Sequence, residues 1–358
     1  YLALLGLFYC RDTERRLMKF DTMLRTFDLS SIPAHVERFE RLGIDGLWTF
    51  EAEHDPFLPL AVAASRRADL DLGTNISVAF GRSPFSMAQV AWDLQNSSDG
   101  KFHLGLGTQV RAHVERRFSM PFDQPAKRLA DYIRCLRSIW DTFQKGSRPD
   151  YKGEFYQFTL MNPFFNPGAI DNPHIPIWIA GVNTGMCRIA GEVADGFHVH
   201  PMHSAGYVRE VIRPAISRGA SSENRLQEDI DLYAPVFAVT GETQAELDES
   251  EAEVRRQISF YASTPNYRAV LDYHDAGGIA KDLSAKARSG EWRQMAELIP
   301  DRLIDEFAIV AKPADLAAKL RERYDGLLDR VSLYFPLPRD DSDDVWTDFL
   351  TSFRTNSA

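Results

Sequence analysis

The sequence predicts a single (β/α)₈ TIM barrel, and three observations favour this fold. Short apolar runs alternate with longer amphipathic patterns along most of the chain, as expected for βαβ units around a parallel sheet. Eight such runs can be counted, which is the number of strands that closes this barrel. A length of 358 residues, with no internal repeat and no linker rich in Gly, Ser or Pro, fits one large domain.

The expected strands and helices follow one another in regular order. The apolar runs predict strands at residues 19–24, 46–49, 72–79, 102–105, 177–180, 196–199, 231–239 and 330–334. Helical periodicity predicts helices at residues 32–42, 58–68, 86–97, 126–143, 184–193, 207–218, 243–263 and 313–324. A last helix at residues 345–353 is expected to complete the outer ring.

Three segments depart from the regular pattern. Residues 151–173 are rich in aromatic residues, Pro and Asn, and residues 265–309 are largely helical. Insertions in a barrel are expected on the C-terminal face of the strands, where they form walls or a lid. The first 17 residues are interpreted as an N-terminal extension or alternative start, with an ordinary helix or strand as the other possibility. The barrel domain is then expected to span residues 18–358.

Composition excludes several classes of protein. With 41 basic and 51 acidic side chains, the net charge of -10 disfavours a nucleic-acid binder, which needs a basic surface. No stretch approaches the roughly 18 to 20 apolar residues that span a membrane. Cys10, Cys135 and Cys187 are too widely spaced for a disulfide framework or a CxxC site, and a reducing, cytoplasmic location fits best.

A glycine-bearing turn follows the predicted strand at residues 102–105. It reads Gly105-Leu106-Gly107-Thr108-Gln109 and leads into a basic stretch that begins near Arg111. Glycines let backbone N–H groups approach an anion closely, and a nearby arginine can add a charged contact to a phosphate. The turn is neither a Walker A loop nor a full GxGxxG motif. A plain tight turn between strand and helix is the alternative interpretation.

A second such turn, Ala180-Gly181-Val182-Asn183, follows the predicted strand at residues 177–180. Asn183 or Thr184 is expected to cap the next helix, whose first N–H groups offer another anion site. Two such turns in one barrel indicate a cofactor with a flat ring and a phosphorylated tail. The alternative is that both turns are structural caps without a ligand.

The order of several short motifs resembles the luciferase-like monooxygenase family. These motifs are GIDGLW at 43–48, LGT at 72–74, RSP at 82–84 before AQ at 88–89, SDGKFHLGLG at 98–107, IWIAG at 177–181 and ADGF at 194–197. Within that family the chain is most similar to the branch that uses the deazaflavin F420, which residues 54–58 and 111–117 favour. The resemblance implies hydride transfer between F420 and a small organic substrate. Its close variant uses reduced FMN and O₂ for monooxygenation.

The resemblance also implies where the cofactor lies. The ring is expected across the strand ends, in front of a non-proline cis peptide bond between Asn75 and Ile76. The resemblance assigns the tail phosphate to Gly107, Thr108 and Gln109 with Arg111 close by, and the other end of the ring or tail to Ala180, Gly181 and Val182. A homodimer is expected as well.

The catalytic assignment rests on a departure from the family pattern. F420-dependent relatives often place an acidic residue followed by His at the end of the second strand, whereas this chain has Glu51 followed by Ala52. We expect Glu51 to fill the acidic position and His54 to substitute from the loop. A His beside a carboxylate can pass a proton near neutral pH. The alternative is that both residues only order the loop or cap a helix.

Three histidines, His198, His200 and His203, lie within six residues after a predicted strand. They suit either zinc ligation, in a metal-dependent barrel hydrolase, or the lining of a substrate pocket, or a structural role. Because no acidic ligand cluster accompanies them, we expect no metal and assign His198 and His200 to the substrate pocket. Trp48 is expected beside them, near the ring. A barrel that binds a ligand without catalysis is a third possibility.

Overall fold

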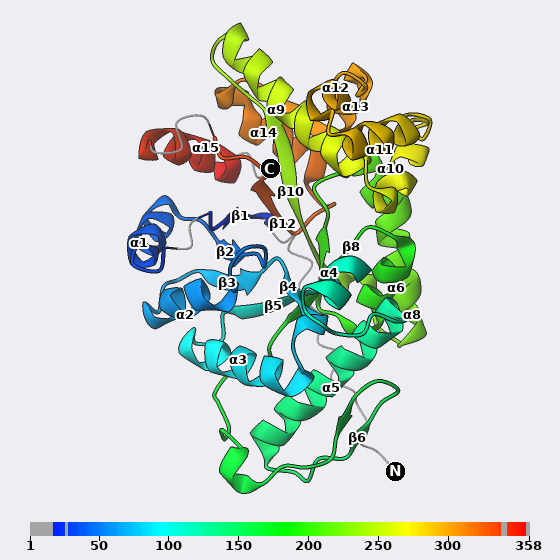
Figure 1. The fold of residues 1–358 in the computed structure, drawn as a ribbon. Coiled ribbons are helices and arrows are strands. Elements are labelled where there is room, and N and C mark those ends of the chain that lie inside the picture. Colours follow the sequence, from blue (N-terminus) through cyan, green and yellow to red (C-terminus); the bar gives the residue numbers. More distant parts are fainter. Residues whose placement is uncertain (1–16, 26–27, 338–341, 356–358) are drawn as a thin grey trace, which may run out of the picture.

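The apolar runs of the sequence form parallel strands that close into a barrel (Figure 1). The computed structural model describes residues 17–25, 28–337 and 342–355, so the predicted extension lies almost wholly outside the described residues. Around the barrel the strands are β1 (Lys19–Met23), β2 (Gly46–Thr49), β3 (Asp71–Thr74), β5 (Phe102–Gly107), β8 (Ile177–Gly181), β9 (Gly196–Val199), β10 (Asp231–Val239) and β12 (Arg330–Leu333). Pairing of Lys19 with Arg330 closes the ring, and the predicted fold is confirmed.

Helices cover the outside of the barrel. They are α1 (Ile32–Leu42), α2 (Phe57–Ser65), α3 (Pro84–Ser97), α5 (Pro125–Lys145), α6 (Thr184–Val193), α8 (Arg213–Ser222), α9 (Gln244–Ala262), α14 (Pro313–Tyr324) and α15 (Asp343–Thr355). In α5, Leu129, Ile133 and Leu136 recur every three to four residues and are buried, so one face of the helix packs inward. Within the described part of the chain, no helix combines the length and the apolar character needed to cross a membrane.

The third strand is interrupted. The sequence predicts one strand over residues 72–79, but the structure has β3 and then a separate short strand β4 (Ser77–Val78), which pairs with β5. Between them lies a cis peptide bond from Asn75 to Ile76. The bond that the family resemblance implied is therefore present at this position.

The helical insertion lies at the C-terminal end of β10. It contains α10 (Arg268–Tyr273), α11 (Ile279–Ser289), α12 (Trp292–Ala296), α13 (Asp301–Phe307) and the strand β11 (Ala308–Val310). Strand β11 pairs with the last residues of β10, Phe237 to Val239. Asn266 and Tyr267, at the start of the insertion, reach the barrel mouth. The first residues of this insertion thus form part of the wall at the mouth.

The aromatic segment at residues 151–173 lies elsewhere than expected. It forms a hairpin of β6 (Tyr151–Lys152) and β7 (Gln157–Phe158). This hairpin lies beside α5 and not at the barrel mouth (Figure 1). Asp131 of α5 accepts hydrogen bonds from the Tyr151 hydroxyl and from the Phe155 backbone N–H. This segment connects a helix to the following strand, and such connections belong to the opposite face of the barrel from the strand-to-helix loops.

A buried ion network fills the N-terminal end of the barrel. Arg330 donates from Nε and Nη2 to the two carboxylate oxygens of Asp21, at 2.6 and 2.8 Å, and from Nη1 to Asp71 at 2.6 Å. The indole of Trp48 donates to the same Asp21 carboxylate at 2.8 Å. Arg330 and Asp71 begin β12 and β3, whereas Asp21 lies in the middle of β1 and Trp48 in β2, so the network ties four strands together below the mouth.

Candidate functional site at the barrel mouth

A cavity of about 810 Å³ opens at the C-terminal ends of the strands. Four strands end in it, because Met23 is the last residue of β1, Gly107 of β5, Gly181 of β8 and Val199 of β9. The cis segment and the insertion after α9 supply further parts of the wall. This volume falls within the range of about 300–1,000 Å³ that is typical of small-molecule sites.

Eight of the nine predicted cofactor-binding residues line this cavity: Asn75, Ile76, Gly107, Thr108, Gln109, Ala180, Gly181 and Val182. The two glycine turns, more than seventy residues apart in the sequence, thus face one space. That convergence is the geometry on which the predicted binding site depended.

Both glycines are needed for close packing at the mouth. A β-carbon on Gly107 would lie 2.6 Å from Cδ1 of Ile76, and one on Gly181 would lie 2.4 Å from Cγ of Met186. Contacts shorter than 3.0 Å require the neighbouring side chain to move. The side chains of Ile76 and Met186 therefore occupy the space that glycine leaves, and both residues line the cavity.

Arg111, the ninth predicted residue, is not among the residues that line the cavity. It begins the short helix α4 (Arg111–Arg116), where its guanidinium donates to Glu115 at 2.8 Å and lies 5.3 Å from the ring of Phe122. Its side chain is 62% exposed. The structure thus pairs this arginine within its own helix.

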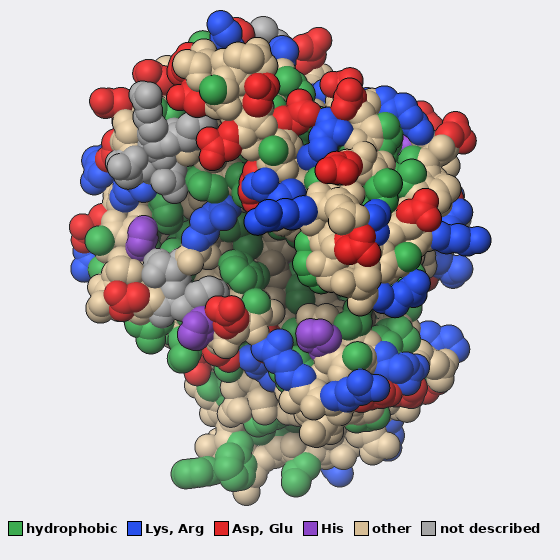
Figure 2. All heavy atoms as spheres, turned by 45° about the horizontal axis from the view of Figure 1, so that its top comes forward, with side chains coloured by type: hydrophobic (Ala, Val, Ile, Leu, Met, Phe, Trp, Pro, Cys, Tyr) green, Lys and Arg blue, Asp and Glu red, His purple; other side chains and the backbone are tan. Residues whose placement is uncertain are grey.

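The charge of the cavity wall is positive. Among the described residues that line it, Arg25 is the single Lys or Arg, and no Asp or Glu is present. Arg25 follows β1 and donates a hydrogen bond to the backbone carbonyl of Tyr334. Figure 2 shows a face of the molecule that is hollowed near its centre, with Lys and Arg side chains around the hollow. Such a wall favours an anionic ligand over a cationic one.

His198 is buried at the cavity, with 2% of its surface exposed. Neither of its ring nitrogens has a hydrogen-bond partner within the part of the chain that the structure describes. Burial, and then the nearby His103, lower the pKa of His198 to about 3, so the ring is neutral at physiological pH. Buried polar atoms without partners are rare and costly, and an orphaned imidazole facing a cavity points to a ligand there.

His200 lines the same cavity but is held by protein groups. Its Nδ1 accepts the backbone N–H of Met202 at 3.1 Å, and its Nε2 lies 2.9 Å from the Tyr267 hydroxyl. Tyr261 and Tyr334, whose hydroxyls are 2.7 Å apart, complete a wall of phenols beside it. His198 and His200 thus both line this cavity, and their contact with a substrate stays a prediction.

The three histidines do not converge on one point. His203 is buried and is not among the lining residues; its Nδ1 lies 2.9 Å from the carbonyl of His200. Among the residues that the structure describes, no group of three His, Cys, Asp or Glu side chains is placed to hold a metal ion.

Glu51 and His54 lie outside the cavity wall. The Glu51 carboxylate accepts the Val78 N–H at 2.7 Å and is paired with Arg82 at 2.7 Å, and Arg82 also donates to Asp55 at 2.7 Å. The Glu51 backbone N–H donates to the Ile76 carbonyl at 3.0 Å. Glu51 thus ties the loop after β2 to the cis segment, whereas His54 is exposed on that loop.

Trp48, expected in the substrate pocket, lies inside the barrel instead. It is fully buried and packs against Trp178, His198 and Tyr233. It is not among the lining residues, because its indole is turned towards Asp21 at the N-terminal end. Neighbouring residues on a strand, such as Leu47 and Trp48, point to opposite faces. This alternation does not show whether an inward side chain lies at the mouth or deeper in the barrel.

Sequence reasoning missed several lining residues. Arg25 and Phe50 directly follow the strands predicted at residues 19–24 and 46–49. Because the C-terminal ends of barrel strands form the mouth, this position could have identified both residues. Tyr261 and Tyr267 come from the end of α9 and the turn after it. No local pattern marks these two tyrosines, since they reach the mouth through the packing of the insertion.

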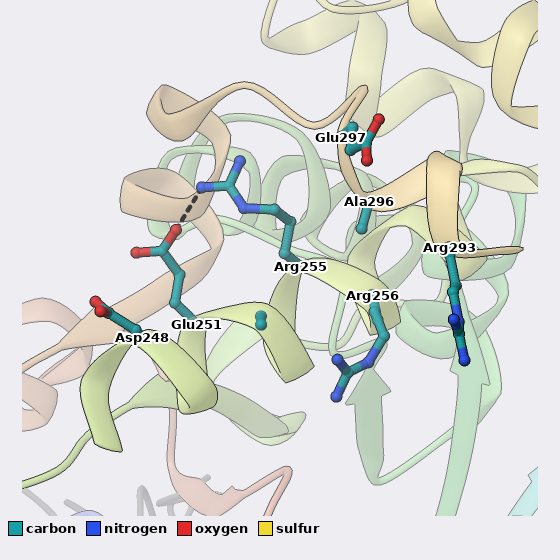
Figure 3. A pocket seen from close by; sticks show the side chains of 8 residues that line it. Asp248, Glu251, Arg255, Arg256, Arg293, Ala296 and Glu297 are labelled. Atoms are coloured by element: carbon teal, nitrogen blue, oxygen red, sulfur yellow. Dashed lines mark hydrogen bonds and ion pairs between the residues drawn. The ribbon is translucent and has the colours of Figure 1, made fainter. Parts of the chain in front are cut away.

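A second hollow, of about 680 Å³, lies between α9 and α12 (Figure 3). Three arginines and three carboxylates line it, and Arg255 is paired there with Glu251 of the same helix. Because the opposite charges offset one another and none of the predicted site residues lies there, the barrel mouth is the stronger candidate site.

The family model described as luciferase-like monooxygenase matches residues 12–330, which is most of the chain. The chain belongs to this family. The resemblance inferred from the order of the sequence motifs is therefore confirmed.

Relatives of the chain include two proteins of Mycobacterium tuberculosis. An uncharacterised protein is 44% identical over 292 residues, which are 82% of this chain and 86% of the relative. A putative coenzyme F420-dependent oxidoreductase is 26% identical and covers 76% of this chain and 81% of the relative. Among solved structures, the coenzyme F420-dependent tetrahydromethanopterin reductase of Methanopyrus kandleri has a TM-score of 0.74 at 19% identity, covering 93% and 97% of the two chains. That structure shares the fold.

Proposed function

We propose that the chain is an F420-dependent oxidoreductase that transfers a hydride between the deazaflavin and a small organic substrate at the barrel mouth. One observation carries this proposal: the two glycine turns and the cis segment open onto the same cavity. The relative named as a putative coenzyme F420-dependent oxidoreductase supports the choice of cofactor.

The residues at the mouth fit such a cofactor. Gly107 and Gly181 line the cavity at the ends of β5 and β8, beside a wall that carries Arg25 and no carboxylate, which suits a phosphorylated tail. Asn75, Ile76 and Val182 would border the ring, and the orphaned imidazole of His198 offers a hydrogen bond to it. When bound, F420 would supply the hydride chemistry, while the protein supplies position and electrostatics.

The phenol wall suits the organic substrate. The wall contains Tyr261, Tyr267 and Tyr334. These tyrosines come from α9, from the turn after it and from the loop after β12, whereas the glycine turns follow β5 and β8. Their rings provide apolar surface with polar tips. Glu51 would act here by positioning the cis segment, and its participation in proton transfer with His54 stays a prediction.

A monooxygenase that uses reduced FMN and O₂ is the second candidate, because the family model itself carries that description. The same cavity could hold either ring. The homodimer and the cytoplasmic location expected from the sequence also stay predictions.

Titration of the purified protein with F420 and with FMN in parallel, followed by the fluorescence of each ring, tests the proposal. We expect F420 to bind with a micromolar or lower Kd and FMN at least about tenfold more weakly. Preferential binding of FMN, together with oxygen consumption when FMN is reduced, would favour the monooxygenase. Binding of neither would contradict both.

A further inference from the structure

The hydrogen bonds of His200 fix which of its ring nitrogens carries the proton. A backbone N–H can only donate, so the Nδ1 atom that accepts the Met202 N–H at 3.1 Å is unprotonated. Burial, and then His203, lower the pKa of His200 to about 3, so the ring is neutral at physiological pH. Its single proton therefore resides on Nε2.

This tautomer sets the orientation of the Tyr267 hydroxyl. The protonated Nε2 lies 2.9 Å from Tyr267 Oη and donates to it, so the phenol oxygen is the acceptor of that bond. The phenol must then direct its own proton elsewhere. Burial, and then Tyr334, raise the pKa of Tyr267 to about 12, so that proton is retained at neutral pH.

The Tyr267 proton faces the cavity. Tyr267 lines the cavity, and among the described residues its hydroxyl has one hydrogen-bond partner, the His200 ring, which donates to it. The hydroxyls of Tyr261 and Tyr334 are paired with each other at 2.7 Å, and that bond uses the proton of one of them. Tyr267 is therefore a phenol of this wall with a donor left for a ligand, and it is the one whose orientation is set by His200.

Ring packing holds the donor in place. The imidazole of His200 lies with its centroid 4.4 Å from the ring of Tyr267 and 4.5 Å from that of Tyr261. Its other nitrogen is bound to the backbone of Met202, so the imidazole is fixed at both ends. A donor that is oriented before a ligand arrives loses little freedom on binding.

We propose that Tyr267 is a substrate-binding hydrogen-bond donor, with His200 as its positioning residue, and that the substrate is a carbonyl compound or the corresponding alcohol whose oxygen accepts this bond. The inference rests on the proposed function only for the reaction that follows binding. It names a substrate class for the same cavity: an organic molecule with an acceptor oxygen and an apolar body that packs against the tyrosine rings.

Matched pairs of small molecules test the substrate class. Cyclohexanone and methylenecyclohexane, or acetophenone and α-methylstyrene, have nearly the same shape but only the first of each pair has an acceptor oxygen. Their affinities are measured by calorimetry with and without F420. We expect the wild type to prefer the ketone by about tenfold and Tyr267→Phe to lose that preference while binding the hydrocarbon within about twofold of wild type.

Tyr261→Phe is the matched control, since it removes a phenol of the same wall whose hydroxyl is already paired. It should keep the preference for the ketone. Equal affinity of the wild type for the two members of each pair, or a preserved preference in Tyr267→Phe, would overturn the proposal. Ketone preference without F420 binding would support the role of Tyr267 and contradict the proposed cofactor. F420 binding without ketone preference would contradict the role of Tyr267 alone.

The tautomer can be observed directly. In ¹⁵N–¹H correlation spectra of the histidine rings at pH 7, assigned with His200→Gln, we expect His200 to be protonated on Nε2 and unprotonated on Nδ1. The opposite tautomer, or a doubly protonated ring, would remove the basis for the orientation of Tyr267.

Discussion

Gly107 and Ile76 share one space at the mouth of the barrel, since a β-carbon on Gly107 would lie 2.6 Å from Cδ1 of Ile76. Gly107 ends β5, and Ile76 completes the cis peptide bond of the third strand. This contact joins the first glycine turn to the cis segment, so the two features that define the proposed ring site depend on each other.

Substitution of Gly107 tests that dependence. Gly107→Ala should push the Ile76 side chain into the cavity and weaken F420 binding by about tenfold, measured by fluorescence titration. The double variant Gly107→Ala/Ile76→Ala should recover most of the affinity because it restores the space. Gly278→Ala is the control, since a β-carbon there meets nothing within 4 Å. An unchanged Kd in Gly107→Ala would contradict this interpretation.

Arg25 and Arg111 give different expectations for the anionic tail. Arg25 lines the cavity, whereas Arg111 is paired with Glu115. Arg25→Ala should weaken F420 binding by about tenfold, Arg25→Lys should retain most of it, and Arg111→Ala should stay within about twofold. Kd values at low and high salt provide the measurement. A larger loss in Arg111→Ala would support the assignment made from the sequence and remove Arg25 from the tail site.

Glu51 should act on the site through structure. Glu51→Gln weakens the pair with Arg82, so we expect the free energy of unfolding to fall by about 2 kcal/mol and the affinity for F420 to fall with it. Glu53→Gln, on the exposed side of the same loop, should change neither quantity. Urea unfolding and fluorescence titration measure both. If Glu51→Gln kept its stability and affinity but lost turnover, Glu51 would belong to catalysis, as the sequence pattern suggests.

Buried histidines should make the protein sensitive to acid. Burial lowers the pKa of His203 to about 4 from an ordinary value of 6.5, so the unfolded chain binds this proton at a higher pH than the folded chain does. The stability that His203 contributes is therefore present above pH 6.5 and is lost as the pH falls towards 4. When the pH falls from 6.5 to 4, the free energy of unfolding of His203→Gln should therefore decrease by about 3 kcal/mol less than that of the wild type.

Urea unfolding at several pH values between 4 and 7.5 measures that difference. His113→Gln, on the exposed surface of α4, is the control and should follow the wild type. Parallel pH profiles for His203→Gln and the wild type would show that the folded protein takes up the His203 proton as readily as the unfolded chain.

The fold could be predicted from the sequence because its strands and helices have local periodicity. All eight barrel strands lie where apolar runs predict them, and Gly107 and Gly181 could be identified because parallel strands gather their C-terminal ends at one mouth. Hydrophobic pattern alone does not reveal the break between β3 and β4, since both strands are buried. The cis bond at Asn75 could be anticipated only through the family resemblance.

Features that depend on long-range packing could not be predicted. Tyr267 reaches the mouth because the insertion after α9 folds back over the strands, and no spacing near it records that path. The position of residues 151–173, in contrast, follows from the order of the elements, because the segment connects a predicted helix to the next predicted strand and such connections lie on the face opposite the mouth. Trp48 shows that alternation along a strand identifies the side that faces the barrel interior, but not the height within it.

A crystal structure of the protein with F420 measures the location of the cofactor directly. We expect density for the tricyclic ring between Gly107 and Gly181, beside the Asn75–Ile76 bond, with the tail towards Thr108 and Gln109. Density in the hollow between α9 and α12 instead, or a ring that contacts only one of the two glycine turns, would contradict the convergence of the turns on one cofactor.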